Sequence, residues 1–149
     1  MSGQLTHSPG YVVRKALVDL TDGTLPSASG AWPIHTANMP NKPDSAILIT
    51  ETAGKISGRD HNSGTIQEHQ GIQIMVRASR FSTAYTKAGQ IIQSIDEDIL
   101  RTAVTISSST YEIQSITRTT GALNIGKEEG TKRQIFTINA IVSLRETTT

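Results

Sequence analysis

The chain has 149 residues, a formal net charge of +1 at pH 7 and no cysteine. This length suits one domain, and the lack of cysteine excludes disulfides, thiolate metal sites and cysteine nucleophiles. Nucleic-acid-binding proteins usually gather basic residues on one face, so a nearly neutral chain argues against that class. Only 4% of the residues are aromatic, so the core must rely on aliphatic side chains and is thin. Such a domain gains further burial by assembling with other chains.

The two ends of the chain carry no targeting pattern. Met1–Ser8 lacks a basic stretch followed by an apolar run, so we expect no secretory signal. No apolar run approaches the roughly 20 residues that a membrane span needs. We therefore expect a soluble, non-secreted single domain over 1–149, with a flexible arm at 1–7 and a frayed tail at 147–149.

A first helix is predicted to begin at Ser8 and Pro9, because a hydroxyl caps free amides and proline suits the first turn. Asp22-Gly23 should end it, since glycine tolerates a left-handed exit. The apolar residues between these signals recur at helical spacing and form one face: Val13, Ala16, Leu17 and Leu20.

Two strands and a long connection should follow. Trp32–Thr36 is a candidate for a short strand at a sheet edge, because Pro33 lacks a donor. Ser45–Thr52 contains a β-branched apolar run and predicts a strand. Ala53–Gln70 has three glycines and neither a helical nor a strand period, so we expect a long loop projecting from a hairpin.

The longest predicted helix covers Phe81–Thr102, after a strand at Gly71–Ser79 with alternating apolar residues. The residues of its apolar stripe recur every three or four positions: Phe81, Ala84, Tyr85, Ala88, Ile91, Ile92, Ile95 and Ile99. The polar residues expected to face away from the core are Lys87, Gln90, Gln93, Asp96 and Glu97.

The remainder of the chain reads as strands at Val104–Ser107, Thr110–Thr117 and Gln134–Arg145, and Ala122–Ile125 is a candidate to continue the second of these. The order α-β-β-β-α-β-β-β predicts an α+β fold. We expect an antiparallel or mixed sheet with both helices packed on one face.

The densest group of ionisable residues lies in the long loop and comprises Arg59, Asp60, His61, Glu68 and His69. A metal site would need these ligands on rigid elements, and the loop is rich in glycine. Solvated loop residues are the preferred interpretation, and a metal site is the alternative. We expect neither a cofactor nor catalysis.

Two further charged features stand out. Arg77 interrupts a neutral strand, and its fork geometry suits a carboxylate. It faces solvent or forms an ion pair within or between subunits. Asp96-Glu97-Asp98 lies on the polar side of the long helix. It is either a solvated face or an acidic surface that contacts a partner or faces a channel.

The order of elements is similar to that of a known family. Pro43–Gly54 is a strand that ends in glycine, and after the long loop comes Ile72–Ala78, followed by the amphipathic helix with Tyr85, Ala88 and Ile95. This arrangement resembles the tail-terminator and minor-capsid (neck) proteins of tailed bacteriophages, over Ser8 to about Arg145.

The resemblance implies a structural virion protein, assembled in the host cytoplasm, that forms a homo-oligomeric, hexameric ring. The ring would cap the tail tube and join it to a head-side neck protein, and DNA would pass through without specific binding. We expect the contacts with other subunits or partners to involve Arg77, Lys55, Arg59, Asp60, His61, Asn139 and Arg145. The alternatives are a head-completion or tail-completion protein, a small ligand-binding or enzyme domain, and a DNA-binding protein.

Overall fold

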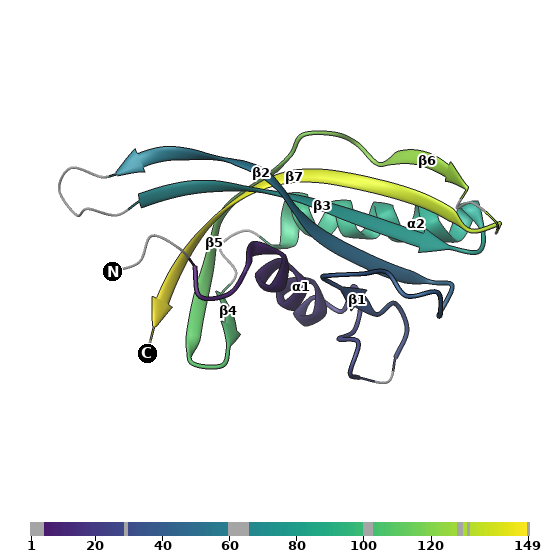
Figure 1. Ribbon diagram of the computed structural model, residues 1–149, viewed down its shortest axis with the longest axis horizontal. Coiled ribbons are helices and arrows are strands. Elements are labelled where there is room, and N and C mark those ends of the chain that lie inside the picture. The colour runs from purple at the N-terminus through teal and green to yellow at the C-terminus, as the bar shows by residue number, and fades with distance from the viewer. Residues whose placement is uncertain are drawn as a thin grey trace.

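The computed structural model describes residues 5–28, 30–59, 66–99, 103–127, 130 and 132–148. Two α-helices, α1 (Pro9–Asp19) and α2 (Phe81–Gln93), accompany one sheet, and α2 runs directly into a π-helical turn, η1 (Ser94–Asp98) (Figure 1). The seven strands are β1 (Ile34–His35), β2 (Ala46–Arg59), β3 (Ile66–Ala78), β4 (Ala103–Ile106), β5 (Ser109–Arg118), β6 (Leu123–Lys127) and β7 (Gln134–Thr148).

The sheet is mixed, as predicted. Its strand order is β1-β2-β3-β7-β5-β4, and β6 also pairs with β7. Only the short β1–β2 pair is parallel among these strands. β5 and β6 follow one another along the same side of β7, since Arg118 lies opposite Ala140 and Leu123 lies opposite Thr137. The segment at 122–125 therefore continues the line of the preceding strand, but as a separate element.

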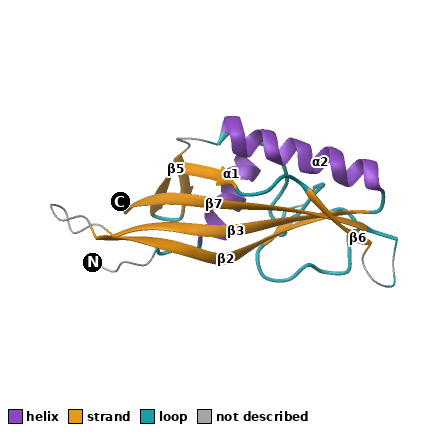
Figure 2. Cartoon of the chain, turned by 90° about the horizontal axis from the view of Figure 1, so that it is seen from above, coloured by secondary structure: helices purple, strands orange, loops and turns teal. Residues whose placement is uncertain are grey.

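Both helices lie on the same face of the curled sheet, which confirms the predicted layering (Figure 2). Alternate residues of the central strands point to that face. Ile74 of β3 lies between Ile49 of β2 and Ile138 of β7, and all three side chains are fully buried. The α1 and α2 side chains join the same buried cluster, so the helices share one core with the sheet.

Helix α1 begins where the sequence predicts and ends earlier. The Ser8 Oγ accepts a hydrogen bond from the Tyr11 N–H at 3.4 Å, and Pro9 occupies the first turn. The left-handed residue after the helix is Thr21, with φ of 64°, and not Gly23. The predicted end at Asp22-Gly23 is wrong because Asp22 turns back into a buried hydrogen bond with Ser94.

The predicted helix over 81–102 is also too long as a single α-helix. It is α-helical to Gln93 and then widens into the π-helical turn, in which the Ile99 N–H donates to the Ser94 carbonyl at 2.8 Å. The bond between Ser94 and Asp22 fixes the start of this turn. Ile95 and Ile99 both remain fully buried. Residues 100–102 lie outside the described residues.

The two ends of the described chain lie against each other. The Thr6 N–H donates to Glu146 Oε1 at 2.9 Å, and the His7 N–H donates to the Tyr111 hydroxyl at 2.8 Å. Residues 6 and 7 of the predicted arm thus contact β7 and β5, and residues 1–4 lie outside the described part. Strand β7 continues to pair with β5 at Thr147 and Thr148, and residue 149 is not described. The flexibility of the arm and the fraying of the tail stay predictions.

The predicted loop over 53–70 is the largest correction to the secondary structure. Strand β2 continues to Arg59 and β3 starts at Ile66, so most of this segment forms a long antiparallel hairpin, whose connection at 60–65 lies outside the described residues. Register shifts fall between Thr52 and Lys55 and between Ile56 and Gly58. These bulges remove the two-residue period that a sequence pattern needs. The hairpin extends beyond the helices (Figure 1).

Candidate assembly interface

The distal part of the β2–β3 hairpin is the first surface available to a partner. Lys55 lies opposite His69, and Arg59 lies opposite Ile66, so two predicted contact residues belong to this hairpin. Asp60 and His61, which were predicted beside them, lie outside the described residues. Among the described strands, β1 borders β2 only at Ile47 and Leu48. The outer backbone edge of β2 therefore has no partner strand beyond that point in the described chain.

Arg77 holds a loop within the subunit. Its side chain is only 2% exposed. The guanidinium donates to the carbonyls of Pro40 and Pro43 at 2.7 Å and to that of Asp44 at 3.2 Å. Of the two predicted alternatives, the solvent-facing position is wrong. That Arg77 contacts another subunit remains a prediction, although a buried side chain offers little surface for such a contact.

Arg133 supports the same loop and was not singled out from the sequence. Its guanidinium donates to the Asn41 carbonyl and to Asn41 Oδ1, the latter at 3.0 Å, and lies 3.5 Å from Asp44 Oδ1. The side chain is 6% exposed. Its position in a run of charged turn residues gave no signal of burial. Two buried arginines thus hold the 40–44 loop against the end of the sheet.

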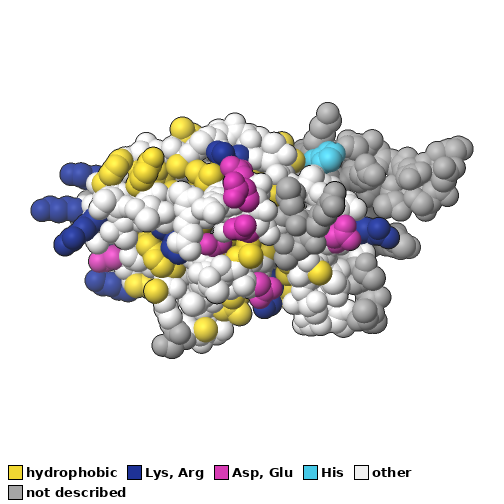
Figure 3. Space-filling model, turned by 180° about the vertical axis from the view of Figure 1, so that it is seen from behind, with side chains coloured by type: hydrophobic (Ala, Val, Ile, Leu, Met, Phe, Trp, Pro, Cys, Tyr) yellow, Lys and Arg dark blue, Asp and Glu magenta, His cyan; other side chains and the backbone are white. Residues whose placement is uncertain are grey.

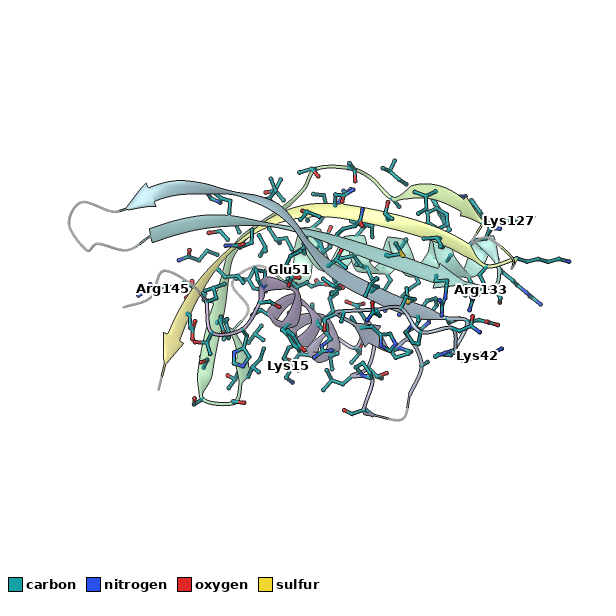
Figure 4. All side chains as sticks on the ribbon, in the orientation of Figure 1. Lys15, Lys42, Glu51, Lys127, Arg133 and Arg145 are labelled. Carbon is teal, nitrogen blue, oxygen red and sulfur yellow. The ribbon has the colours of Figure 1, made fainter. Side chains whose placement is uncertain are left out.

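The other two predicted contact residues lie on β7. Asn139 is half-buried opposite Gln73, and its backbone carbonyl accepts from the Thr119 N–H at 2.9 Å. Arg145 is exposed and lies opposite Glu112. Figure 4 shows Arg145 near the hairpin end and Arg133 at the opposite end of the molecule. The structure therefore does not bring the predicted contact residues together into one site.

An aromatic pair covers the first turns of α2. Phe81 and Tyr85 are 52% and 60% exposed, and their rings stack with centroids 6.2 Å apart and planes within 9°. Both rings meet the edge of buried Phe136, at 5.3 and 6.0 Å. The prediction that both face the core as part of the helical stripe is wrong. The buried residues of α2 are Ala84, Lys87, Ala88 and Ile91.

Strand β6 carries two further exposed apolar side chains at the same end of the molecule (Figure 1). Leu123 and Ile125 are 48% and 58% exposed. Asn124 lies opposite Phe136 and Leu123 lies opposite Thr137, so Leu123 points to the face of the sheet away from α2. We call the four residues Phe81, Tyr85, Leu123 and Ile125 the edge patch. Figure 3 shows hydrophobic side chains gathered over α2 and β6, at the end away from the hairpin. Exposed apolar residues are ordinary on a protein surface, so these four are candidates for a contact only if a partner covers them.

A charged groove lies near β6. Arg118 Nε and Nη2 donate to the two carboxylate oxygens of Asp96 at 2.9 and 2.8 Å. This pairing lowers the pKa of Asp96 and raises the pKa of Arg118. The pair borders an open groove of about 430 Å³ that the 116–121 segment lines. Glu97 and Asp98 are exposed beside it, and Asp96 of the predicted acidic group is neutralised within the subunit.

A buried polar network connects the residues after α1 to α2. The Lys87 ammonium donates to the Asp22 carbonyl at 2.6 Å and to Gln90 Oε1 at 3.1 Å, and it lies 5.1 Å from the Trp32 ring centroid. The Ser94 hydroxyl donates to Asp22 Oδ2 at 2.5 Å. The prediction that Lys87 faces away from the core is wrong, since its side chain is 7% exposed.

Burial governs the titration of this network. It raises the pKa of Asp22, against the hydrogen bond from Ser94, and lowers the pKa of Lys87, against the attraction of Asp22. The two groups lie between elements and not in an accessible pocket, so the network joins the helices and their loops. Within the described residues, no three histidine, aspartate or glutamate side chains converge on a metal position. The described helices are all too short or too polar to cross a membrane.

Similarity to known proteins assigns the chain to a family. The family model described as bacteriophage tail terminator protein matches residues 17–145. A chain from a structure titled virion of native gene transfer agent particle is similar, with a TM-score of 0.47 and 10% identity over 74% of this chain and 77% of that chain. No curated protein matches. The family model covers most of the sequence, and the chain therefore belongs to the bacteriophage tail terminator family.

Proposed function

We propose that this protein forms a closed hexameric ring that caps the phage tail tube and joins it to the head-side neck. Family membership establishes the coarser statement, a structural protein of the virion tail or neck. The observation that carries the finer one is the presence of two unlike features at opposite ends of one subunit, an open strand edge and a group of exposed apolar side chains. These are the β2–β3 hairpin and the edge patch (Figure 1).

A ring requires this kind of asymmetry. In a heterologous interface, one surface of a subunit meets a different surface of the next, and the assembly closes if the rotation permits. A two-fold dimer would instead need one self-complementary surface. Exposed strand edges are suited to joining chains because their backbone donors and acceptors have no partner. The outer edges of β2 and β6 are of this kind among the described strands.

The charge of the chain supports free passage of DNA through the ring. Strong binding to phosphates needs concentrated lysine and arginine. The chain has 14 basic and 13 acidic residues, and among the basic ones Arg77 and Arg133 are buried. We propose that DNA crosses the lumen without specific binding, and that tail-tube and neck proteins are the binding partners.

The role we propose is structural and not enzymatic. The perturbed groups have structural partners: Asp22 and Lys87 join the helices, and Asp96 pairs with Arg118. Each of these groups is held by a partner within the fold. Assembly therefore accounts for the observed side chains better than catalysis does.

The direct test is a phage from which this gene is removed, with the chain resupplied. We expect tails that neither terminate nor join heads, and restoration of both by the wild-type chain, scored by electron microscopy. Purified protein added to isolated tail tubes should appear as a ring at one end. Tails that terminate and join heads normally without the chain would contradict the proposal.

A further inference from the structure

We propose that the π-helical turn η1 is a two-state switch, and that Asp22 couples it to the loop after α1. In the structure, η1 has a π register and holds Asp96 against Arg118. In the second state the turn is α-helical, Asp96 rotates away, and the Arg118 guanidinium is released into the groove that the 116–121 segment lines. The switch lies within one subunit and goes beyond the proposed ring.

The sequence of the turn suits both registers. The Ile99 N–H donates to the Ser94 carbonyl at 2.8 Å, five positions earlier, which defines the π register. In a regular α-helix the same N–H would donate to the Ile95 carbonyl. Ile91, Ile95 and Ile99 follow at four-residue steps, and residues at that spacing share one face of an α-helix. All three are fully buried in the structure, so apolar burial alone does not require the π register.

A hydrogen bond to Asp22 explains why the helix widens at Ser94. A π turn is rare in proteins and needs a local cause. The Ser94 hydroxyl donates to Asp22 Oδ2 at 2.5 Å, and the two residues are only 5% and 2% exposed. Hydrogen bonds that a hydroxyl donates to a carboxylate are short and strong. This bond therefore fixes the position of Ser94, whose carbonyl accepts the first hydrogen bond of the π register.

The loop after α1 holds the other side of Asp22. Thr21 and Trp32 have φ of 64° and 57°, a left-handed backbone that residues with a side chain rarely adopt. The Lys87 ammonium donates to the Asp22 carbonyl at 2.6 Å and lies 5.1 Å from the Trp32 ring centroid. Lys87 therefore keeps a disfavoured loop conformation in place. Backbone strain of this kind is concentrated in segments that switch conformation, and Asp22 links this loop to η1.

The two registers differ in the charge that the groove presents. An α-helical turn contains fewer residues than a π turn, so a change of register rotates Asp96 about the helix axis relative to α2. Arg118 Nε and Nη2 donate to both Asp96 carboxylate oxygens at 2.9 and 2.8 Å, and such a bidentate pair has a specific geometry. The π state presents a neutral pair, and the α state presents a guanidinium without its carboxylate. A partner that binds one state more tightly shifts the equilibrium between them.

NMR couplings across hydrogen bonds test the register directly, because they show which carbonyl accepts from the Ile99 N–H. In the wild-type chain we expect the Ile99 nitrogen to couple to the Ser94 carbonyl carbon. Ser94→Ala removes only the hydroxyl, and the coupling should move to the Ile95 carbonyl carbon. The Arg118 Nε–H should then exchange with solvent several-fold faster. Ser82→Ala, at an exposed position of α2, is the control and should keep the wild-type coupling.

Variants of Asp22 test the same bond from its other side. Asp22→Asn retains an oxygen that accepts from the Ser94 hydroxyl, so we expect the π register to remain. Asp22→Leu has a similar volume and no acceptor, so the α register should replace it. If Asp22→Leu does not fold, Ser94→Ala still decides the register, because that variant adds no atoms to the core.

The coupling to the loop has a reporter of its own, since Trp32 is the only tryptophan in the chain. Lys87→Met keeps the aliphatic stem and removes the ammonium that holds the loop. We expect the Trp32 emission to shift to longer wavelength and the Ile99 coupling to move in part from Ser94 to Ile95. The control is the same substitution on α1, at the partly exposed lysine that pairs with an aspartate one turn later. It should change neither signal.

Each part of the switch has a result that overturns it. If the coupling of Ile99 to Ser94 persists in Ser94→Ala, the turn has one register and is not a switch. If Ser94→Ala changes the register but Lys87→Met leaves it unchanged, Asp22 does not couple the loop to η1. If the register changes while exchange of the Arg118 Nε–H does not, the groove is not controlled by the turn. All three results leave the proposed ring unaffected.

Discussion

Apolar side chains are buried in the centre of the sheet and exposed at one of its ends. In the centre, Ile74, Ile138 and Ile91 are fully buried between strands and helices. At the edge patch, Tyr85 and Ile125 are 60% and 58% exposed. In the centre, helices and strands of one chain cover these side chains. The distal part of the β2–β3 hairpin has no helix over it, and the edge patch lies where α2 begins (Figure 1). The residues that stabilise the fold and the surfaces that we propose for assembly therefore lie in separate parts of the molecule.

The separation is not explained by composition, because aliphatic residues occur in both parts. It follows from the lengths of the elements. Helices α1 and α2 are shorter than β2 and β3, so they cover the middle of the hairpin and leave its distal half bare (Figure 2). Strand β6, with five residues, covers only part of the side of β7. Each prediction below tests whether a change in one part leaves the other part intact.

The largest effect on stability should come from the centre. Ile74→Ala removes a fully buried side chain between Ile49 and Ile138. The free energy of unfolding should fall by about 2–5 kcal/mol, from lost burial and the cavity left behind. Urea denaturation measures it. The matched variant Ile125→Ala should change the same quantity by at most about 0.5 kcal/mol; a similar loss in both variants would break the comparison.

Arg77→Met should have the next largest effect. The substitution keeps the apolar stem but leaves the carbonyls of Pro40, Pro43 and Asp44 without the guanidinium. Hydrogen bonds to a charged group and unpaired carbonyls suggest a loss of about 2–3 kcal/mol in the free energy of unfolding. Arg145→Met, at an exposed position of β7, is the control. Equal stability of the two variants would mean that Arg77 does not hold the loop.

The buried network predicts a dependence of stability on pH. Burial raises the pKa of Asp22 in the folded state, so the folded chain holds this proton more tightly than the unfolded chain. The contribution of Asp22 to the free energy of unfolding is fully present below its unfolded pKa of 3.8. It is lost as the pH rises through the higher pKa that Asp22 has in the folded state. Asp22→Asn should remove this decrease in the free energy of unfolding with rising pH. We would compare urea unfolding of both proteins from pH 3.5 upward, and parallel pH profiles would contradict the assignment.

The smallest effect should come from the exposed pair of Asp96 and Arg118. Its side chains are 40% and 27% exposed, so the coupling energy should be below about 1 kcal/mol and fall with salt. The pKa of Asp96 is lowered, so the contribution is present above the unfolded value and disappears as pH falls through the folded one. A double-mutant cycle with Asp96→Asn and Arg118→Gln measures the coupling. A coupling well above that range, or one unaffected by salt, would show a desolvated pair.

The sequence predicted the elements of the centre well, because burial on one face leaves a period. The strand at 71–79 and the helix beginning at Phe81 both show it, and the structure confirms them. The same reasoning failed for Ala53–Gln70, since bulges at the Thr52–Lys55 and Ile56–Gly58 steps interrupt the alternation of an otherwise regular hairpin. A local pattern cannot report a strand whose register shifts twice.

The contact surfaces could be predicted only in part, because exposure depends on elements far apart in sequence. Phe81 and Tyr85 have helical spacing, but Phe136 already fills the space beneath them. Lys87 lies on the polar side by pattern, yet the loop after α1 buries it beside Asp22. Arg77 was correctly selected as unusual, and its partners proved to be carbonyls of a loop more than 30 positions earlier. The proposed roles of Lys55, Arg59, Asn139 and Arg145 remain predictions.

The most direct test of the whole account is the mass of the native assembly, measured by native mass spectrometry on the wild-type chain alone and after release from capped tail tubes. We expect a closed ring with six times the mass of one chain. Oligomers with two to five chains should be minor species. A chain that remains monomeric both at high concentration and on tail tubes would contradict the central claim that the uncovered ends of the sheet are built to join copies of this protein.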